Sequence, residues 1–410
     1  MKMQNLNFDD AKNLLLARVE ALPPRREDLS ECLGLVLAED VVARENIPFR
    51  TNSAMDGFAV IAADTIEASP DHPVALEILE TIEAGDVPTR SVTSGACSRI
   101  MTGAIMPEGA DAVVRVEDTN ASGDSVTIFA SVRLGRDVRP AGEDIAEGET
   151  ALTSGTELRP YEIGLLAAVG ASEPLVVPRV RVAVLASGSE LVPVSASLSA
   201  GKVRNSNGPA IRAQCLAVGA VPVDFGIVED MDQATEQALE RAVETCDVVV
   251  TSGAVSMGEK DRIRPTIERL GEVLFWGVAM RPGKPVLFGR IRGKPFFGLP
   301  GNPASSMVAF ELFVRPALRK MMGHAILEYP MREARSAETI TPRPGLTMFL
   351  RAILESRDGE LWVRRSGPQG SGMHVPLARA NCLAVISGDR PIAEGESIPV
   401  ILLGDSALVI

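Results

Sequence analysis

The sequence predicts a multidomain chain in which a central doubly wound α/β unit lies between a β-rich unit and a small C-terminal β-barrel. Three observations support this fold class. The 410 residues exceed one ordinary core, and the usual domain size gives about two to four domains. Strand and helix patterns alternate between residues 180 and 322. Short β-branched runs separated by Gly, Pro and Asp fill residues 46–145 and the region after Pro330.

The first predicted domain is a helical and linker domain that joins residues 1–45 to residues 146–178. Each segment contains one helix with a recognisable start, because an Asn that suits an N-cap precedes one and an Arg-Pro pair precedes the other. The expected helices cover residues 7–21 and 161–169. Residues 46–145, which separate the two segments, are the predicted β-rich domain.

Residues 179–326 are the predicted α/β domain. Their pattern is typical of a doubly wound parallel sheet, whose ligands bind beyond the carboxyl ends of the strands. The expected strands cover residues 180–185, 221–225, 247–251, 273–279, 285–291 and 295–299, and the expected helices cover residues 209–218, 232–245, 262–270 and 303–322.

Residues 327–410 are expected to form the C-terminal barrel. Short strands with Gly-containing turns are typical of such small barrels or sandwiches. The expected strands cover residues 348–354, 360–364, 382–386 and 397–403.

Composition excludes several classes of protein. The chain carries 41 Lys and Arg against 54 Asp and Glu, and a net charge of −13 argues against a nucleic-acid partner. No apolar run approaches the ~20 residues that cross a bilayer, which argues against a membrane partner. The five cysteines are scattered and form no CxxC pair, which fits a reducing compartment, so a cytoplasmic protein is expected. The three histidines show no metal-ligand spacing. Neither a Gly-x-Ser-x-Gly elbow nor a Walker A pattern is present.

Four loops rich in Gly, Ser and Pro follow strands of the α/β domain, at residues 186–191, 252–258, 280–285 and 298–305. Small residues let backbone N–H groups approach anionic oxygens, and the helix that begins near Pro303 adds its positive end. One such loop is ordinary turn chemistry, but four at the strand ends of one sheet favour a phosphate-bearing ligand. The candidate ligand-binding residues in these loops are Ser187, Gly188, Ser252, Gly253, Ser256, Pro300, Gly301, Asn302 and Ser305.

Charged residues at the same strand ends sharpen this hypothesis. Arg281 and Lys284 offer a guanidinium fork and an ammonium group to an oxyanion. Glu190, Asp230 and Asp261 are expected on the same edge, where carboxylates beside phosphates require a hard cation such as Mg²⁺. For Glu190 or Asp230 alone, a solvated surface acid explains the residue equally well.

The β-rich domain contains polar turns with three candidate residues, Asp56, Thr102 and Asp144. Asx turns use the same residue types, so their chemistry alone does not separate a structural role from a functional one. The last domain contains a flexible loop at residues 367–372 with hydroxyl and amide donors.

Taken together, eight segments resemble the MoeA family of molybdopterin molybdenumtransferases, which are related to the gephyrin E domain. The α/β unit alone also resembles MogA-type molybdopterin adenylyltransferases and the CinA family, but the flanking β units favour MoeA. The segments, in order along nearly the whole chain, are NSAMDGFAV (52–60), MTGAIMP (101–107), GEDI (142–145), SGSEL (187–191), SGAVSMGEKD (252–261), RPGKP (281–285), GLPGNPAS (298–305) and GPQGSG (367–372).

The resemblance implies an enzyme that inserts molybdate into adenylylated molybdopterin with Mg²⁺ and releases AMP. It implies a homodimer with a cleft between the α/β domain of one subunit and β domains of the other, and contacts with molybdopterin adenylyltransferase and molybdoenzymes. Glu190, Asp230 and Asp261 match acids near the nucleotide and the metal. Arg281, Lys284, Ser371 and Arg351 match the molybdate pocket, and Asp56, Thr102 and Asp144 match catalytic positions of the active cleft.

Two departures from the family pattern affect the metal and the oxyanion. Ser189 stands where many relatives have Asp, and Gly277 stands where some have Lys, which leaves open the metal affinity and the preference for molybdate over tungstate. The alternative functions are the adenylyltransferase step, a CinA-like nucleotide hydrolase and a gephyrin-like scaffold.

Overall fold

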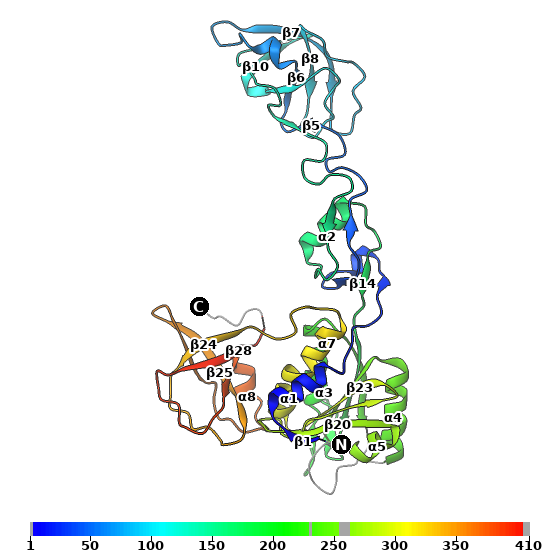
Figure 1. Ribbon diagram of the computed structural model, residues 1–410, viewed down its shortest axis with the longest axis vertical. Coiled ribbons are helices and arrows are strands. Elements are labelled where there is room, and N and C mark those ends of the chain that lie inside the picture. The colour runs from blue at the N-terminus through cyan, green and yellow to red at the C-terminus, as the bar shows by residue number, and fades with distance from the viewer. Residues whose placement is uncertain (1–2, 229–231, 254–262, 405–410) are drawn as a thin grey trace. The chain divides into compact units, whose positions relative to one another are not determined.

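The computed structural model describes residues 3–228, 232–253 and 263–404. Contacts divide the chain into two compact units (Figure 1). One unit contains residues 26–33 and 37–175, and the other contains residues 1–25, 34–36 and 176–410. The four domain boundaries expected from the sequence stay a prediction.

The unit built from residues 26–33 and 37–175 contains a six-stranded mixed sheet in the order β10-β11-β7-β8-β6-β9. Its core is formed by aliphatic side chains and Phe58, which is 1% exposed. This sheet confirms a β-rich region within residues 46–145. Its strands are β6 (Gly57–Val60), β7 (Val74–Ile82), β8 (Ala96–Ile100), β9 (Ala112–Arg115), β10 (Thr119–Ser122) and β11 (Ser125–Ile128).

The same unit has short strand pairs and helices outside this sheet. Strand β5 pairs with β12, and β4 pairs with β13, all antiparallel. Pro160 occupies the first turn of helix α2, where its missing N–H costs no hydrogen bond. These elements are η1 (Leu29–Glu31), β4 (Val41–Val42), β5 (Asn52–Ser53), η2 (Ala62–Thr65), η3 (Val116–Asp118), β12 (Val138–Arg139), β13 (Thr150–Leu152) and α2 (Pro160–Ala168). Three further strands, β2 (Arg25–Arg26), β3 (Val36–Leu37) and β14 (Leu175–Val177), lie at the ends of the segments that make up the two units.

The other unit is built around a seven-stranded sheet in the order β1-β20-β22-β23-β19-β15-β18. Strand β1, at its edge, was not predicted from the sequence. The strands are β1 (Met3–Leu6), β15 (Arg181–Ser187), β18 (Val221–Val228), β19 (Val248–Ser252), β20 (Gly271–Val278), β22 (Leu287–Ile291) and β23 (Lys294–Leu299), and the short strands β16 (Leu191–Val192) and β17 (Val203–Arg204) pair separately.

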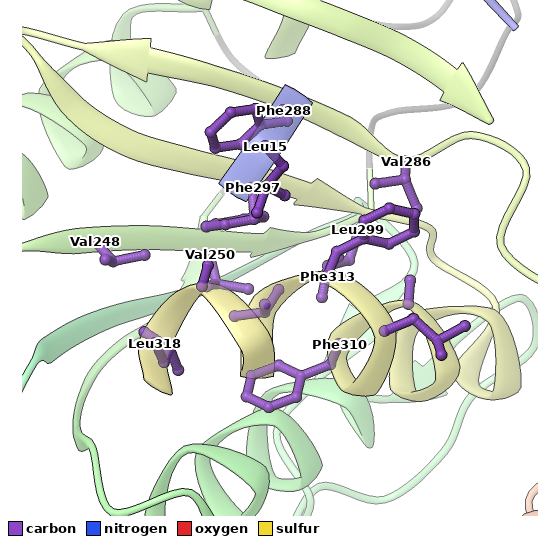
Figure 2. Packing of buried hydrophobic residues seen from close by; sticks show 14 of the residues in the cluster. Leu15, Val248, Val250, Val286, Phe288, Phe297, Leu299, Phe310, Phe313 and Leu318 are labelled. Atoms are coloured by element: carbon purple, nitrogen blue, oxygen red, sulfur yellow. The ribbon is translucent and has the colours of Figure 1, made fainter. Parts of the chain in front are cut away.

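Both faces of the seven-stranded sheet are covered by helices, which confirms the doubly wound architecture. Alternate residues of β15 show this directly, because Val182 and Val184 belong to one core and Ala183 and Leu185 to the other. One face packs against α1 (Phe8–Leu16), α3 (Asn207–Ala217), α6 (Pro303–Ala309), η4 (Phe310–Val314) and α7 (Arg315–Met321), as Figure 2 shows in part, and the other packs against α4 (Asp232–Thr245) and α5 (Ile263–Leu270).

The expectation of an all-parallel sheet is wrong for one strand. Strand β22 runs antiparallel to both of its neighbours, β20 and β23. The reason is the two-residue connection Arg292-Gly293, in which both residues have positive φ (49° and 82°). Such a turn joins antiparallel strands, since a parallel crossover needs a dozen residues or more.

The last predicted helix, over residues 303–322, is interrupted by the π-helical turn η4 between α6 and α7. Pro316 lies in the first turn of α7, where it supplies no backbone N–H to the preceding turn. The widened turn before the proline accommodates this loss while Phe310 and Phe313 stay fully buried (Figure 2).

Five C-terminal strands close into a barrel, which confirms the predicted architecture. Pairings run in a ring from β24 to β26, β25, β27, β28 and back to β24. A sixth strand, β21, adds to β25 in parallel from the α/β side. The elements are β21 (Met280–Arg281), β24 (Met331–Ser336), β25 (Thr347–Arg357), β26 (Glu360–Arg365), α8 (Val375–Arg379), β27 (Cys382–Ile386) and β28 (Ser397–Leu402).

Within the residues that the structure describes, every helix is too short or too polar to traverse a bilayer.

Candidate functional site

The strand-end loops lie at one edge of the seven-stranded sheet. Ala186 aligns with Ser252, and Ser252 aligns with Leu299, so β15, β19 and β23 end together. Leu287 aligns with both Gly298 and Trp276, which places the end of β20 at the same edge. The prediction that four loops share an edge is therefore confirmed for the described residues. We call this the strand-end edge.

Gly253 brings two of these loops into close contact. Its φ is +97°, and a Cβ atom there would lie 2.0 Å from the carbonyl oxygen of Ser187. Its N–H donates to the Leu299 oxygen at 3.1 Å, and a Cβ on Gly301 would lie 3.7 Å from the Gly253 Cα. Only glycine satisfies both the backbone conformation and the spacing, so the sequence leaves bare backbone at the centre of the edge.

A buried polar network, which the sequence analysis missed, holds these loops in place. The Asn207 amide donates to the Ser252 hydroxyl at 2.7 Å and to the Gly301 oxygen at 2.8 Å. The Ser252 hydroxyl lies 3.4 Å from the Ser306 hydroxyl, and both side chains are buried. The Ser252 hydroxyl is thus used in contacts that hold the loops together. Asn207 lies at the start of α3, and only its helix-start context hinted at a special role.

Ser187 and Ser305 are also buried at the edge, at 7% and 5% exposure. Pro300 is buried, whereas Gly301 and Asn302 are exposed. The exposed backbone of Gly301 and Asn302, together with the start of α6, could bind an anionic ligand, as the sequence predicted.

Of the three acids proposed for a metal, only Glu190 lies within the described residues. It is exposed, and its carboxylate folds back over the loop, because a Cβ on Gly188 would lie 2.8 Å from Glu190 Oε1. Lys202 donates to the Ser189 carbonyl oxygen at 2.6 Å, beside this acid. Asp230, Asp261 and the candidate ligand Ser256 lie outside the described residues. Within the described part of the chain, no group of three acids, histidines or cysteines is placed to hold a metal.

The RPGKP loop connects the strand-end edge to the barrel. Met280 and Arg281 form β21, where they align with Thr347 and Met348 of β25. Arg281 is half-buried, and Lys284 is exposed at the end of the loop. Gly277, just before it, has a φ of +82°, a backbone conformation that favours glycine.

A cavity of about 400 Å³ lies beside β21 and is rich in arginine; we call it the arginine cavity. Four arginines line it, and no Asp or Glu is among its lining residues. Its lining residues are Arg281, Pro282, Thr339, Ile340, Thr341, Arg343, Met348, Phe349, Leu350, Arg351, Arg365 and Gln369.

Arg351 is the most unusual residue of this cavity. It is 1% exposed, and burial lowers the pKa of its guanidinium. Its Nη2 donates to the Gly370 oxygen at 3.0 Å and the Pro368 oxygen at 3.4 Å, while its Nε is buried without an acceptor. No carboxylate of the described residues pairs with it. A buried cation without a counter-charge is costly, which fits a site built to receive an anion.

The loop over residues 367–372 lies between the two surfaces. The Ser371 oxygen accepts the N–H of Ala304 at 3.0 Å, in the first turn of α6. The Gln369 amide donates to the Arg351 oxygen at 3.0 Å and accepts the Arg351 N–H at 2.9 Å. The structure therefore brings Arg281, Arg351 and the loop of Ser371 together, and it adds Gln369, which the sequence analysis did not single out.

In the other unit, Asp56 and Thr102 are in direct contact. Asp56 Oδ1 accepts from the Thr102 N–H and hydroxyl, both at 2.7 Å, and these bonds lower the pKa of the Asp56 carboxyl. Asp144 is exposed, and its N–H donates to the Ile47 oxygen at 3.0 Å. The three side chains are available at the surface, and their catalytic roles stay a prediction.

Models of known families match three successive parts of the chain. Residues 6–170 match the MoeA N-terminal region (domain I and II), and residues 333–403 match the MoeA C-terminal region (domain IV). Residues 183–320, which include the strand-end edge, match a probable molybdopterin binding domain. The fold and this match thus define a multidomain protein whose central α/β domain belongs to the class of probable molybdopterin binding domains.

Individual relatives agree over nearly the whole chain. Molybdopterin molybdenumtransferase 2 of Mycobacterium tuberculosis is 40% identical, covering 96% of this chain and 98% of its own. Molybdopterin molybdenumtransferase of Bacillus subtilis is 36% identical, covering 92% and 89%. The crystal structure of a molybdopterin biosynthesis MoeA protein from Pyrococcus horikoshii has a TM-score of 0.82 at 30% identity, covering 97% and 99%. The chain belongs to the MoeA family of molybdopterin molybdenumtransferases and is a transferase of molybdenum cofactor biosynthesis.

Proposed function

We propose that this enzyme inserts molybdate into adenylylated molybdopterin and releases AMP, as a Mg²⁺-dependent cytoplasmic homodimer. The observation that carries the proposal is the pairing of β21 with β25. Because of this pairing, an edge of bare backbone and a cavity of guanidinium groups lie next to each other within one unit.

The strand-end edge suits the phosphates and the adenylate. Gly253 and Gly301 remove side chains where the loops meet, and Asn207 fixes the spacing of those loops. The start of α6, with its buried Ser305, adds the positive end of a helix. These residues bind and orient the phosphoanhydride without supplying a charge of their own.

The arginine cavity suits the molybdate substrate. Arg281 and Arg351 line it together with Gln369, which belongs to the same loop as Ser371. Lys284 follows Arg281 in the RPGKP loop. A dianion placed there gives the buried Arg351 the counter-charge that the described protein groups do not provide. When the two are held side by side, the dithiolene thiols of molybdopterin would replace one oxo group of the molybdate, which leaves as water with the two thiol protons. A water molecule would cleave the neighbouring phosphoanhydride and release AMP, and positioning rather than a dedicated acid or base would supply most of the catalysis.

A magnesium ion fits the donor set expected at the edge. Mg²⁺ keeps several waters and binds through one or two carboxylates together with substrate phosphates. Glu190 is exposed there, and Asp230 and Asp261 from outside the described residues would complete the set. When bound, the ion would polarise the phosphoanhydride. Asp56, whose pKa is lowered by its hydrogen bonds from Thr102, is proposed with Thr102 and Asp144 to complete the cleft across the dimer.

The test is AMP release from adenylylated molybdopterin by the full chain, with molybdate and Mg²⁺ each supplied or omitted. We expect release to need both and to fall by about 10²-fold or more in Asp261→Asn. Asp358→Asn, a change in a barrel turn, is the matched control and should release AMP like the wild type. ATP consumption without molybdate would instead indicate the adenylyltransferase or hydrolase activity, and peptide binding without AMP release would indicate a scaffold. Tungstate in place of molybdate measures the metal preference.

A further inference from the structure

The arginine cavity contains one cation that neither the family motifs nor the sequence analysis assigns to the site. Arg343 lines the cavity together with Arg281 and Arg351. Its side chain is exposed, and no carboxylate among the described residues forms an ion pair with it. The guanidinium is therefore available to a ligand.

The backbone holds Arg343 at this position. Arg343-Pro344-Gly345-Leu346 is a tight turn, in which the Leu346 N–H donates to the Arg343 oxygen at 3.2 Å and Gly345 has a φ of +72°. Pro then Gly at the two central positions is the pattern of a type II turn. Just before it, Ile340 forms a bridge with Ile392 across the barrel. Arg343 thus projects from a segment fixed at both ends.

The fourth arginine of the cavity is already neutralised. Arg365 Nε lies 2.8 Å from Glu338 Oε2, its Nη2 also contacts that oxygen, and this pairing lowers the pKa of the Glu338 carboxyl. Arg343 differs from it because none of the described acids pairs with it. Within the described part of the chain, the cavity therefore offers three guanidinium groups without an acidic partner, one from β21, one from β25 and one from the turn before β25.

We propose that Arg343 is a further binding residue for the oxyanion substrate and that it sets the preference of the cavity for a tetrahedral dianion. This inference rests on the proposed function, since it assigns molybdate to this cavity. Arg281 and Arg351 approach from the two paired strands, and Arg343 supplies a third set of N–H donors. A third cation favours a dianion over a monoanion of the same shape, because the extra charge gains Coulomb energy that shape alone does not give.

The experiment is calorimetric titration of the full chain with molybdate and with perrhenate, a tetrahedral monoanion of similar size, at fixed ionic strength. Arg343→Gln should weaken molybdate binding about tenfold and perrhenate binding much less, so that the preference for the dianion falls. Arg343→Lys keeps the charge and should recover part of that preference. Arg332→Gln, on an exposed position of β24 in the same barrel, is the matched control and should bind both anions like the wild type.

Three outcomes decide the inference. Wild-type molybdate affinity in Arg343→Gln, with clear loss in Arg281→Gln, overturns the role of Arg343 and leaves the proposed function standing. An equal loss for molybdate and perrhenate in Arg343→Gln, accompanied by a lower Tm, means a structural role and also overturns it. Absence of oxyanion binding in the wild type overturns both this inference and the assignment of molybdate to the cavity.

Discussion

The strand-end edge and the arginine cavity, the two surfaces proposed to bind anions, are built by opposite means. At the edge, glycine backbone and neutral groups such as Asn207 line the site, and the charged residues lie around it. In the cavity, four guanidinium groups line the wall, and among the residues that the structure describes only Arg365 has an acidic partner. Backbone groups follow the extended shape of a phosphate chain, whereas guanidinium forks suit a compact ion. The two surfaces are therefore expected to respond differently to the same kinds of change.

The largest expected effect on folding comes from adding a methyl group at the centre of the edge. Gly253→Ala places a Cβ 2.0 Å from the Ser187 oxygen in a conformation with positive φ, which should lower the free energy of unfolding by roughly 3 kcal/mol and abolish AMP binding. Gly359→Ala has a similar φ (+82°) with no atom within 4 Å, so it should cost only about 1 kcal/mol. Thermal unfolding and AMP titration test this, and equal losses in the two variants would show that the crowding at the edge is not important.

A smaller effect is expected from Asn207→Ala, which removes the two buried bonds at 2.7 and 2.8 Å. The free energy of unfolding should fall by about 2 kcal/mol, and AMP binding should weaken about tenfold because the loops lose their spacing. Molybdate binding should stay at the wild-type level, since Asn207 does not line the arginine cavity. Separate titrations with AMP and molybdate measure both, and a parallel loss of the two affinities would mean that the surfaces are not independent.

The smallest effect on folding is expected from Arg351→Met in the cavity. Methionine removes a buried guanidinium without a counter-charge, so the free energy of unfolding should stay within about 1 kcal/mol of wild type despite the lost bonds to Pro368 and Gly370. Molybdate should no longer raise the Tm, because a ligand stabilises only the state that binds it. Thermal unfolding with and without molybdate measures this. A loss above about 3 kcal/mol with intact molybdate stabilisation would assign Arg351 to folding instead.

The two surfaces also differ in how much of each could be predicted from the sequence. The edge was predictable, because strand periodicity and small residues after each strand are local patterns, and the observed register confirms that the loops meet. The Arg292-Gly293 hairpin was a local signal that the all-parallel expectation overlooked. The role of Asn207 was not predictable, because its partners lie 45 and 94 residues away.

The cavity was predictable only in part: the RPGKP loop indicated Arg281 as an oxyanion ligand, whereas Arg351 was expected only through the family resemblance. Arg281 and Arg351 are separated by 70 residues in sequence, and nothing local indicates that β21 joins β25 or that Arg351 is buried. Arg343 belongs to an ordinary turn pattern, and its lack of a partner emerges only from the folded arrangement. The residues that define the oxyanion surface depend on long-range packing, which periodicity does not report.

The pairing of Met280 and Arg281 with β25 has a consequence for the distance between the two surfaces. The loop that leaves β20 joins the barrel sheet at Met280 and Arg281, so its short covalent length fixes the distance between the proposed phosphate site and the proposed molybdate site. A distance that is fixed by so short a covalent connection varies less with thermal motion than a distance between two domains held together by surface contacts alone.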